Sequence, residues 1–258
     1  MDFKDYEKHG RDGSHVWWYR VKQEIVSSFI EQAAAGKNGP LDILEVGCGT
    51  GGNLRHFRRF GRVIGIDSDP RLKIFFKKNK REFRLGRAEN LPFPASSFDC
   101  VVASDVLEHV EEDSEAVKQI RRVLRPGGLA VVTVPAFQAL FGPSDKHLGH
   151  LRRYNPAGLS ALFDGFEIAY LGYWNSLLFL PAAALKLFKK AVRAQPSTDL
   201  HNLNPFLNEL LYQISAFETR IIASGRRLPF GTSLLCVAKK CRERKGDKRR
   251  AKADLFHL

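Results

Sequence analysis

The residues from Glu45 to Gly51, Glu-Val-Gly-Cys-Gly-Thr-Gly, follow an apolar strand-like run and precede a helical segment. Glycine allows a tight turn and a close approach of the backbone to a ligand, and the start of the next helix offers unpaired N–H groups. The next expected strand ends at Asp67, where a carboxylate can accept hydrogen bonds from both hydroxyls of a ribose. The pattern predicts a nucleoside site at the ends of two neighbouring strands.

Two later segments carry side chains that can move a proton or hold an anion. One runs from Asp105 to His109 after the fourth expected strand, and the other from Asp145 to Tyr154 after the fifth. Histidine suits proton transfer near neutral pH, and arginine binds carboxylates and phosphates. The acid–base candidates are Asp105, His109, His147 and His150, and the acceptor-binding candidates are Asp145, Arg152, Arg153 and Tyr154.

Some of these side chains also have a non-catalytic interpretation. Glu108 and His109 could simply begin a helix and bond to the local backbone. Asp145, His147 and His150 could bind a metal ion, but three such residues on a loop more often form hydrogen bonds. No metal site is therefore predicted.

The elements that must position these residues alternate along the chain. Strands are expected at 41–46, 63–66, 83–85, 98–103, 129–134, 166–173 and 234–239, and helices at 15–35, 53–60, 71–80 and 114–124. Asn155 and Pro156 have the residue types that begin a helix. Alternation of this kind predicts a parallel sheet with helices on both faces.

The chain divides into five expected parts. They are an N-terminal helical cap at 1–40, a core at 41–174, a helical insertion at 175–225, the last strand at 226–240 and a basic tail at 241–258. The insertion holds two amphipathic, apolar-rich stretches, 177–192 and 205–224. We expect it to form a lid, a subunit interface or a membrane-facing surface, with Lys186, Lys189, Lys190 and Arg193 as interfacial anchors.

Composition and charge exclude several classes of protein. With 258 residues and 44% hydrophobic content the chain should fold, and its four cysteines form neither a C-x-x-C pair nor a disulfide framework. The charged N-terminus and the absence of a long apolar run predict a cytoplasmic protein. Most of the net charge of +13 lies in 71–87 and 239–252, which leaves RNA or the anionic inner face of a membrane open as partners.

Five motifs occur together in the order seen in one enzyme family. They are 45–51, Gly-Ile-Asp at 65–67, Ala-Glu-Asn-Leu-Pro-Phe at 88–93, Ser-Phe-Asp-Cys-Val-Val at 97–102 and Leu-Arg-Pro-Gly-Gly at 124–128. In these motifs the chain resembles class I S-adenosylmethionine-dependent methyltransferases, closely over residues 41–135. The stretches 150–154 and 228–235 resemble a bacterial branch whose acceptors are mostly unassigned.

The resemblance implies a Rossmann-like, doubly wound, mostly parallel seven-stranded sheet and S-adenosylmethionine as the cofactor, with S-adenosylhomocysteine as the product. The cofactor-binding residues that it implies are Glu45, Gly47, Cys48, Gly49, Gly51, Asp67, Ser68, Ala88, Glu89 and Ser104, joined by Trp18 and Arg20 from the N-terminal element. Relatives often carry an acid immediately before the alanine, whereas this chain has Arg87.

Three functions remain open on the sequence. The first is methyl transfer, with oxygen preferred, to a small or lipophilic acceptor, lipid-linked acceptors included. The second is modification of RNA through the basic segments, and the third is a non-catalytic methyltransferase-like subunit. The chain has no Asn/Asp-Pro-Pro-Tyr motif and no Pro-Cys nucleophile, which argues against methylation of adenine or glutamine amines and of cytosine carbon 5.

Overall fold

The computed structural model describes residues 16–79, 82–192 and 203–242. The first part of the expected cap, the polar middle of the insertion with Arg193, and most of the basic tail lie outside the described residues.

Seven strands form one sheet in the order β3-β2-β1-β4-β5-β7-β6. The strands are β1 Leu41–Val46, β2 Gly61–Asp67, β3 Glu82–Leu85, β4 Phe98–Ser104, β5 Leu124–Pro135, β6 Phe166–Trp174 and β7 Ser233–Lys240. Strands β1 to β5 pair in parallel, while β7 runs antiparallel between β5 and β6. The predicted mostly parallel seven-stranded sheet is confirmed.

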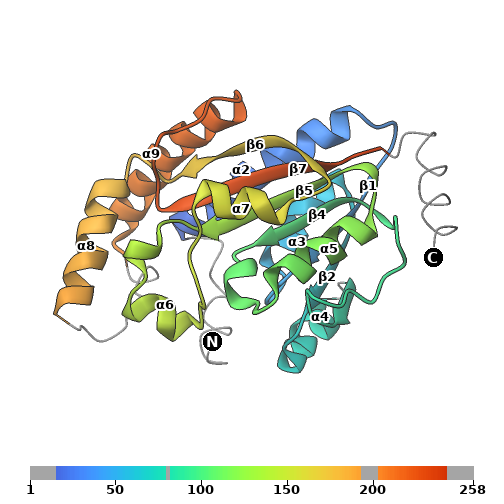
Figure 1. Cartoon of the computed structure of the whole chain (residues 1–258), viewed down its shortest axis with the longest axis horizontal. Helices are drawn as coiled ribbons and strands as arrows, with labels where there is room; N and C mark the ends of the chain where they lie inside the picture. Colours follow the sequence, from blue (N-terminus) through green and yellow to red (C-terminus); the bar gives the residue numbers. More distant parts are fainter. Residues whose placement is uncertain (1–15, 80–81, 193–202, 243–258) are drawn as a thin grey trace, which may run out of the picture.

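Helices cover both faces of this sheet (Figure 1). The α-helices are α2 Trp17–Ala35, α3 Gly52–Phe57, α4 Lys73–Asn79, α5 Asp113–Val123, α6 Pro143–Leu148, α7 Pro156–Leu162, α8 Phe179–Ala191 and α9 Pro205–Ala223. Within the described residues the short 3-10 helices are η2 Arg58–Phe60, η3 Pro70–Leu72, η4 Leu107–His109 and η5 Gln138–Leu140. The two expected helices of the insertion correspond to α8 and α9.

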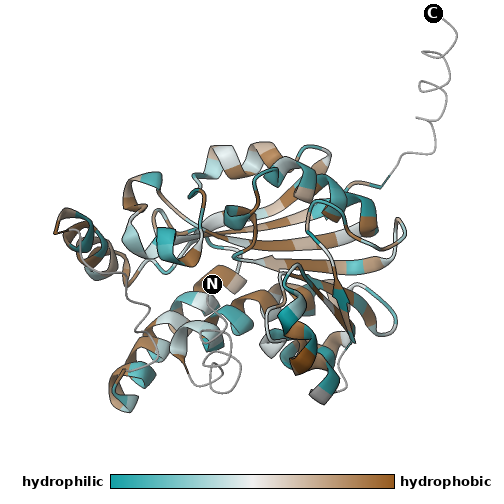
Figure 2. Ribbon diagram, turned by 90° about the horizontal axis from the view of Figure 1, so that it is seen from below, coloured by the Kyte–Doolittle hydropathy of each residue, from teal (hydrophilic) through white to brown (hydrophobic). Residues whose placement is uncertain are grey.

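Alternate residues of the strands point into two hydrophobic cores, one on each face of the sheet. Leu44 and Val46 of β1 point to the face covered by α5 and α7, whereas Leu41 and Ile43 point to the face covered by α2, α3, α4 and α9. Figure 2 shows the strands between these two layers of helices. With β1 to β5 fixed in parallel, their carboxyl ends lie at one edge of the sheet, where open α/β sheets bind ligands.

Two local elements differ from the expected ones. Strand β5 begins at Leu124, five residues before the expected start, but its register with β4 shifts between Leu124 and Leu129, and Gly127 within this irregular part has φ 82°. The segment after β5 contains α6, which was not predicted: Pro143 stands in its first turn and Gly149 ends it in the left-handed conformation, at φ 78°. That ending brings His150 back toward the sheet.

No helix among residues 16–79, 82–192 and 203–242 combines the length and apolar character required to cross a bilayer.

Candidate active site

The glycine loop follows β1. At its first position, Gly47, the backbone conformation favours glycine and a side chain would clash with a neighbour. Gly47 has φ 67° and is exposed, and a Cβ atom there would lie 2.5 Å from Cγ2 of Val106. The loop is tied to the next strand because the N–H of Cys48 donates to the carbonyl of Ile66 over 3.1 Å. The backbone at Gly47 is therefore bare on its solvent side and can touch a ligand directly.

Asp67 closes β2 and faces this loop. Its Oδ2 accepts from the N–H of Gly49 over 2.9 Å, and its Oδ1 accepts from the N–H of Asp69 over 3.1 Å. Burial raises the pKa of Asp67, while these backbone hydrogen bonds oppose the rise. Each carboxylate oxygen has a second lone pair, so the side chain is able to accept from two neighbouring hydroxyls.

Glu45 and Cys48 lie beneath the loop. Both side chains are buried, and Glu45 Oε1 accepts from Nδ2 of Asn53 over 2.7 Å. Oε2 of Glu45 has no hydrogen-bond partner among the described residues. Burial, with a smaller effect from the charge of Asp67, raises the pKa of Glu45 to about 8, although the bond from Asn53 lowers it. This carboxyl group is thus protonated near neutral pH.

The segment after β3 carries the expected adenine-side residues. Ala88 is buried, and Glu89 accepts from Nη2 of Arg87 over 2.6 Å. The hydrogen bond from Arg87 lowers the pKa of Glu89 against the effect of burial. Arg87, the departure from the family pattern, therefore pairs with the carboxylate next to it, and Ser68 is exposed at the end of β2.

Ser104 and Asp105 end β4 at the same edge of the sheet. Ser104 Oγ is buried without a hydrogen-bond partner among the described residues. Asp105 has φ 53° and accepts from Thr133 Oγ1 over 3.1 Å, and its other oxygen pairs with the amine of Lys22. Lys22 was not predicted, because it lies 83 residues earlier, on α2, and no spacing rule connects it to β4.

The N-terminal helix contacts α9 and β6. Trp18 stacks on Trp174 with ring centroids 4.7 Å apart. Arg20 pairs with Glu209 over 2.7 Å and lies over the ring of Tyr212 at 3.4 Å. The guanidinium of Arg20 is thus engaged by two side chains of α9, and its binding of the cofactor remains a prediction.

The two expected acid–base segments meet. The N–H of Leu151 donates to the carbonyl of Glu108 over 2.7 Å, and the hydroxyl of Tyr154 donates to the carbonyl of Leu107 over 3.0 Å. His109 and His150 consequently lie ring to ring, with centroids 4.7 Å apart. His147 is exposed on α6, outside this cluster.

The expected acceptor-binding residues are engaged within the protein. Asp145 is buried and accepts from Arg153 and from the N–H of Gly142 over 2.9 Å. Burial alone would raise the pKa of Asp145, but hydrogen bonds from His150 and Arg153 lower it below its usual value. Arg152 pairs with Asp113 over 2.9 Å.

Tyr154 also bonds to Asp113, over 2.7 Å. The buried Arg153 donates its second hydrogen bond to the carbonyl of Ala136 over 3.0 Å. These contacts give Asp145, Arg153 and Tyr154 a positioning role around His150 that the sequence did not predict. Binding of the acceptor by this group remains a prediction.

The family match to known proteins covers the part of the chain that holds the glycine loop, Asp67 and Asp105. Residues 44–132 match the family model described as a methyltransferase domain. Over 160 residues the chain is 34% identical to a protein of Mycolicibacterium smegmatis named a probable S-adenosylmethionine-dependent methyltransferase, covering 59% of this chain and 60% of the relative. It is 37% identical over 116 residues to a thiol S-methyltransferase of Homo sapiens, covering 42% of this chain and 47% of that protein.

Among solved structures, the fold is similar to that of a protein from Galdieria sulphuraria proposed to be a sarcosine dimethylglycine methyltransferase. The TM-score is 0.58 at 16% identity, covering 85% of both chains. The chain matches only 60% and 47% of the lengths of the two sequence relatives.

Proposed function

Starting from a chain that contains a class I S-adenosylmethionine-dependent methyltransferase domain, we propose that this protein transfers a methyl group from S-adenosylmethionine to a small or lipophilic acceptor. The single observation that carries the proposal is the bond between the N–H of Gly49 and Oδ2 of Asp67. It holds the glycine backbone next to a carboxylate that can still accept hydrogen bonds, at the edge of the sheet where open α/β sheets bind ligands.

The residues around this bond fit the cofactor in their chemistry. Asp67 would accept from the ribose hydroxyls, and the exposed backbone of Gly47 would lie along the methionine portion. The unpartnered Oε2 of Glu45 and Oγ of Ser104 are two buried polar atoms at the same edge for which a bound ligand or water would supply partners. When bound, the cofactor supplies an electrophilic methyl on a sulfonium, so the protein has chiefly to align the acceptor and exclude water.

Aromatic side chains beyond β5 support a lipophilic acceptor. Phe137, which follows β5 with φ 60°, stacks on Tyr173 at 5.1 Å and contacts Phe179 at 5.6 Å. Phe179 also contacts Phe230 at 5.2 Å. Apolar side chains such as Leu180, 73% exposed on α8, continue this surface outward. An apolar acceptor would gain burial against these rings.

The acceptor atom that we propose first is the oxygen of a hydroxyl or carboxyl group. A hydroxyl or carboxyl acceptor must lose a proton, so it needs a base. His109 and Asp105, which lie beyond β4, are the candidates for that base. Burial, followed by the nearby His150, lowers the pKa of His109, which keeps the imidazole neutral and able to accept a proton. The thiol S-methyltransferase relative supports a thiol as a second candidate of the same kind, a weak acid that attacks as its anion.

The other two functions have less support. In the described part of 71–87, Arg71 pairs with Asp69 and Arg87 with Glu89, so part of that positive charge is neutralised locally. The expected membrane anchors Lys186 and Lys190 approach Asp145 at 3.8 Å and the carbonyl of Ala139 at 3.2 Å. A cytoplasmic location with peripheral membrane contact, like the RNA and scaffold functions, remains a prediction.

The proposal is tested by incubating the protein with deuterium-labelled S-adenosylmethionine and three acceptor panels: alkyl and aryl thiols, phenols with fatty acids, and mixed RNA. We expect labelled product from the first or second panel, with S-adenosylhomocysteine formed in equal amount. Product from RNA alone would contradict the proposed acceptor class. Cofactor binding without transfer to any panel or cell extract would favour the scaffold.

A further inference from the structure

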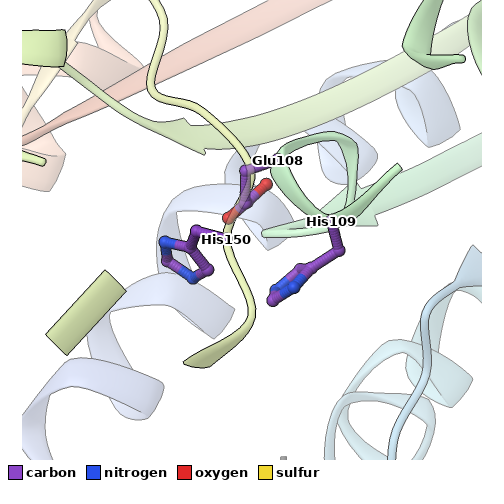
Figure 3. Close-up of side chains that lie close together, drawn as sticks. All are labelled: Glu108, His109 and His150. Atoms are coloured by element: carbon purple, nitrogen blue, oxygen red, sulfur yellow. The ribbon is translucent and has the colours of Figure 1, made fainter. Parts of the chain in front are cut away.

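We propose that Glu108, His109 and His150 form a binding site for a divalent transition-metal ion. One ligand atom from each residue lies within 4.8 Å of the others. Figure 3 shows the carboxyl group of Glu108 close to the two imidazole rings. The planes of the rings are inclined at 84°. Glu108 and His109 come from η4 and His150 from the segment after α6, so the fold brings together ligands that are about forty residues apart in sequence.

The carboxyl group of Glu108 is buried without hydrogen-bond partners in the described part of the chain. The residue is fully buried, and neither Oε1 nor Oε2 has a hydrogen-bond partner among the described residues. The cationic groups nearest to it are committed elsewhere: the amine of Lys22 pairs with Asp105, and the guanidinium of Arg153 with Asp145. An unpartnered buried carboxyl group is costly, and a bound cation would supply what it lacks.

Both imidazole rings are oriented with a nitrogen free to bind a metal. His109 Nδ1 lies 3.2 Å from the carbonyl of Gly149, which can only accept, so Nδ1 carries the hydrogen and Nε2 keeps its lone pair. His150 Nδ1 lies 3.1 Å from Oδ1 of Asp145, whose ionised carboxylate fixes the same tautomer. Histidine ligands of metals usually donate their other N–H to a carbonyl or a carboxylate in this way.

The groups behind the ligands are themselves held in place. Asp145 is fixed by Arg153 and by the N–H of Gly142, and both are buried. The bond from the N–H of Leu151 to the carbonyl of Glu108 fixes the two ligand segments to each other. The left-handed conformation of Gly149 directs its carbonyl toward His109. The site is therefore supported before any ion binds.

Two imidazole nitrogens and one carboxylate suit Zn²⁺, Fe²⁺, Mn²⁺ or Co²⁺ better than Mg²⁺ or Ca²⁺, which prefer oxygen ligands. Ligand atoms about 2.1 Å from one ion stand about 3.4 Å apart in a tetrahedral site, so atoms that now lie up to 4.8 Å apart would have to approach by up to about 1.4 Å when the ion binds. Three protein ligands also leave a coordination position open. If the proposed function holds, this position would take the oxygen or sulfur of the acceptor, because η4 directly follows β4 and Asp105. With Nε2 of His109 on the ion and Nδ1 donating to Gly149, Asp105 rather than His109 would then accept the proton of the acceptor.

The direct test is a titration of untagged, chelator-treated protein with Co²⁺, followed by visible absorption, and with Zn²⁺ against a chromophoric chelator. We expect one ion per chain and Co²⁺ bands typical of nitrogen and oxygen ligation. The variants Glu108→Gln, His109→Asn and His150→Asn should each bind at least about 100-fold more weakly. Asp145→Asn, which removes only the support of His150, should weaken binding about 10- to 100-fold.

His147→Asn is the matched control, because His147 lies on α6 three residues before His150 but outside the cluster. It should bind as the unaltered protein does. Titration of S-adenosylhomocysteine into each variant serves as the folding check. If the unaltered protein binds no Co²⁺ or Zn²⁺, or if all three ligand variants bind as tightly as His147→Asn, the metal site does not exist. Metal binding without methyl transfer would contradict only the proposed function.

Discussion

The two halves of the candidate site are built in different ways. The cofactor half lies within 45–67 and depends on the backbone: Gly47 takes a conformation closed to other residues, and backbone N–H groups hold Asp67. The acceptor half joins η4, the segment 145–154, α2 and α8 through side chains, among them the Arg153–Asp145 and Lys22–Asp105 pairs. Changes in the first half should act through backbone strain, and changes in the second through lost or unpaired charge.

The largest effect is expected at Gly47. In Gly47→Ala, the positive φ costs about 1–2 kcal/mol, and the overlap of the new Cβ with Val106 adds about 1–3 kcal/mol. Denaturant unfolding should therefore show a loss of about 2–5 kcal/mol, and cofactor binding should fail. Adding Val106→Ala should recover only the part of the unfolding free energy that is lost to the overlap with Val106. A Gly47→Ala protein as stable as the unaltered chain would refute the strain.

The next largest effect concerns Glu45 and is a change of the unfolding free energy with pH. Its pKa in the folded protein rises from 4.5 to about 8, so the unfolded chain releases this proton first as pH increases. The contribution of Glu45 to stability is complete below pH 4.5 and is lost as pH rises to about 8. Between pH 5 and pH 8, unfolding in denaturant should show the unaltered protein losing about 2–4 kcal/mol relative to Glu45→Gln. Parallel pH profiles would contradict this.

Lys22 tests the acceptor half. Its side chain is 9% exposed and Asp105 is 30% exposed, so Lys22→Met should leave a half-buried carboxylate without its cation. We expect a loss of about 1–3 kcal/mol in the free energy of unfolding, below the figure for a fully buried pair. The double variant with Asp105→Asn should recover part of that loss. If the losses of Lys22→Met and Asp105→Asn add up to the loss of the double variant, the pair is not coupled.

The smallest effect is expected at Arg20. The Arg20–Glu209 pair is exposed, so Arg20→Ala should lower the free energy of unfolding by less than about 1 kcal/mol. Cofactor affinity should stay within about twofold by titration calorimetry, because the guanidinium contacts α9. Glu209→Ala should match Arg20→Ala in both measurements. A tenfold loss of cofactor affinity in Arg20→Ala but not in Glu209→Ala would indicate that Arg20 binds the cofactor.

Sequence reasoning predicted the sheet and the cofactor half because both are encoded locally. Alternating apolar runs gave the strands to within a few residues, and a loop of glycines needs no distant partner to be recognised. Helix α6 was missed because it is six residues long and has little apolar periodicity. The start of β5 was expected at Leu129 instead of Leu124 because Pro126 and Gly127 are usual in turns, and in the structure they lie where the pairing with β4 is irregular, between the Phe98–Leu124 and Cys100–Leu129 pairs.

The acceptor half escaped prediction because its contacts join residues far apart in the chain. No spacing connects Lys22 with Asp105, and the sequence placed Arg153 on the acceptor because arginine binds carboxylates and phosphates, with no sign that Asp145 is its partner. Asp145, His147 and His150 were the metal ligands considered. The structure instead groups Glu108 and His109 with His150, since Gly149 turns His150 toward η4.

Titration of S-adenosylhomocysteine into Asp67→Ala tests the central claim most directly, with Asp69→Ala as the control from the same turn. Two lost hydrogen bonds to a carboxylate, each worth about 1.5–3 kcal/mol, should weaken binding at least about 100-fold. Asp69 caps η3 and pairs with Arg71, so its removal should change affinity by less than about threefold. An Asp67→Ala protein that binds as tightly as the unaltered chain would contradict the account.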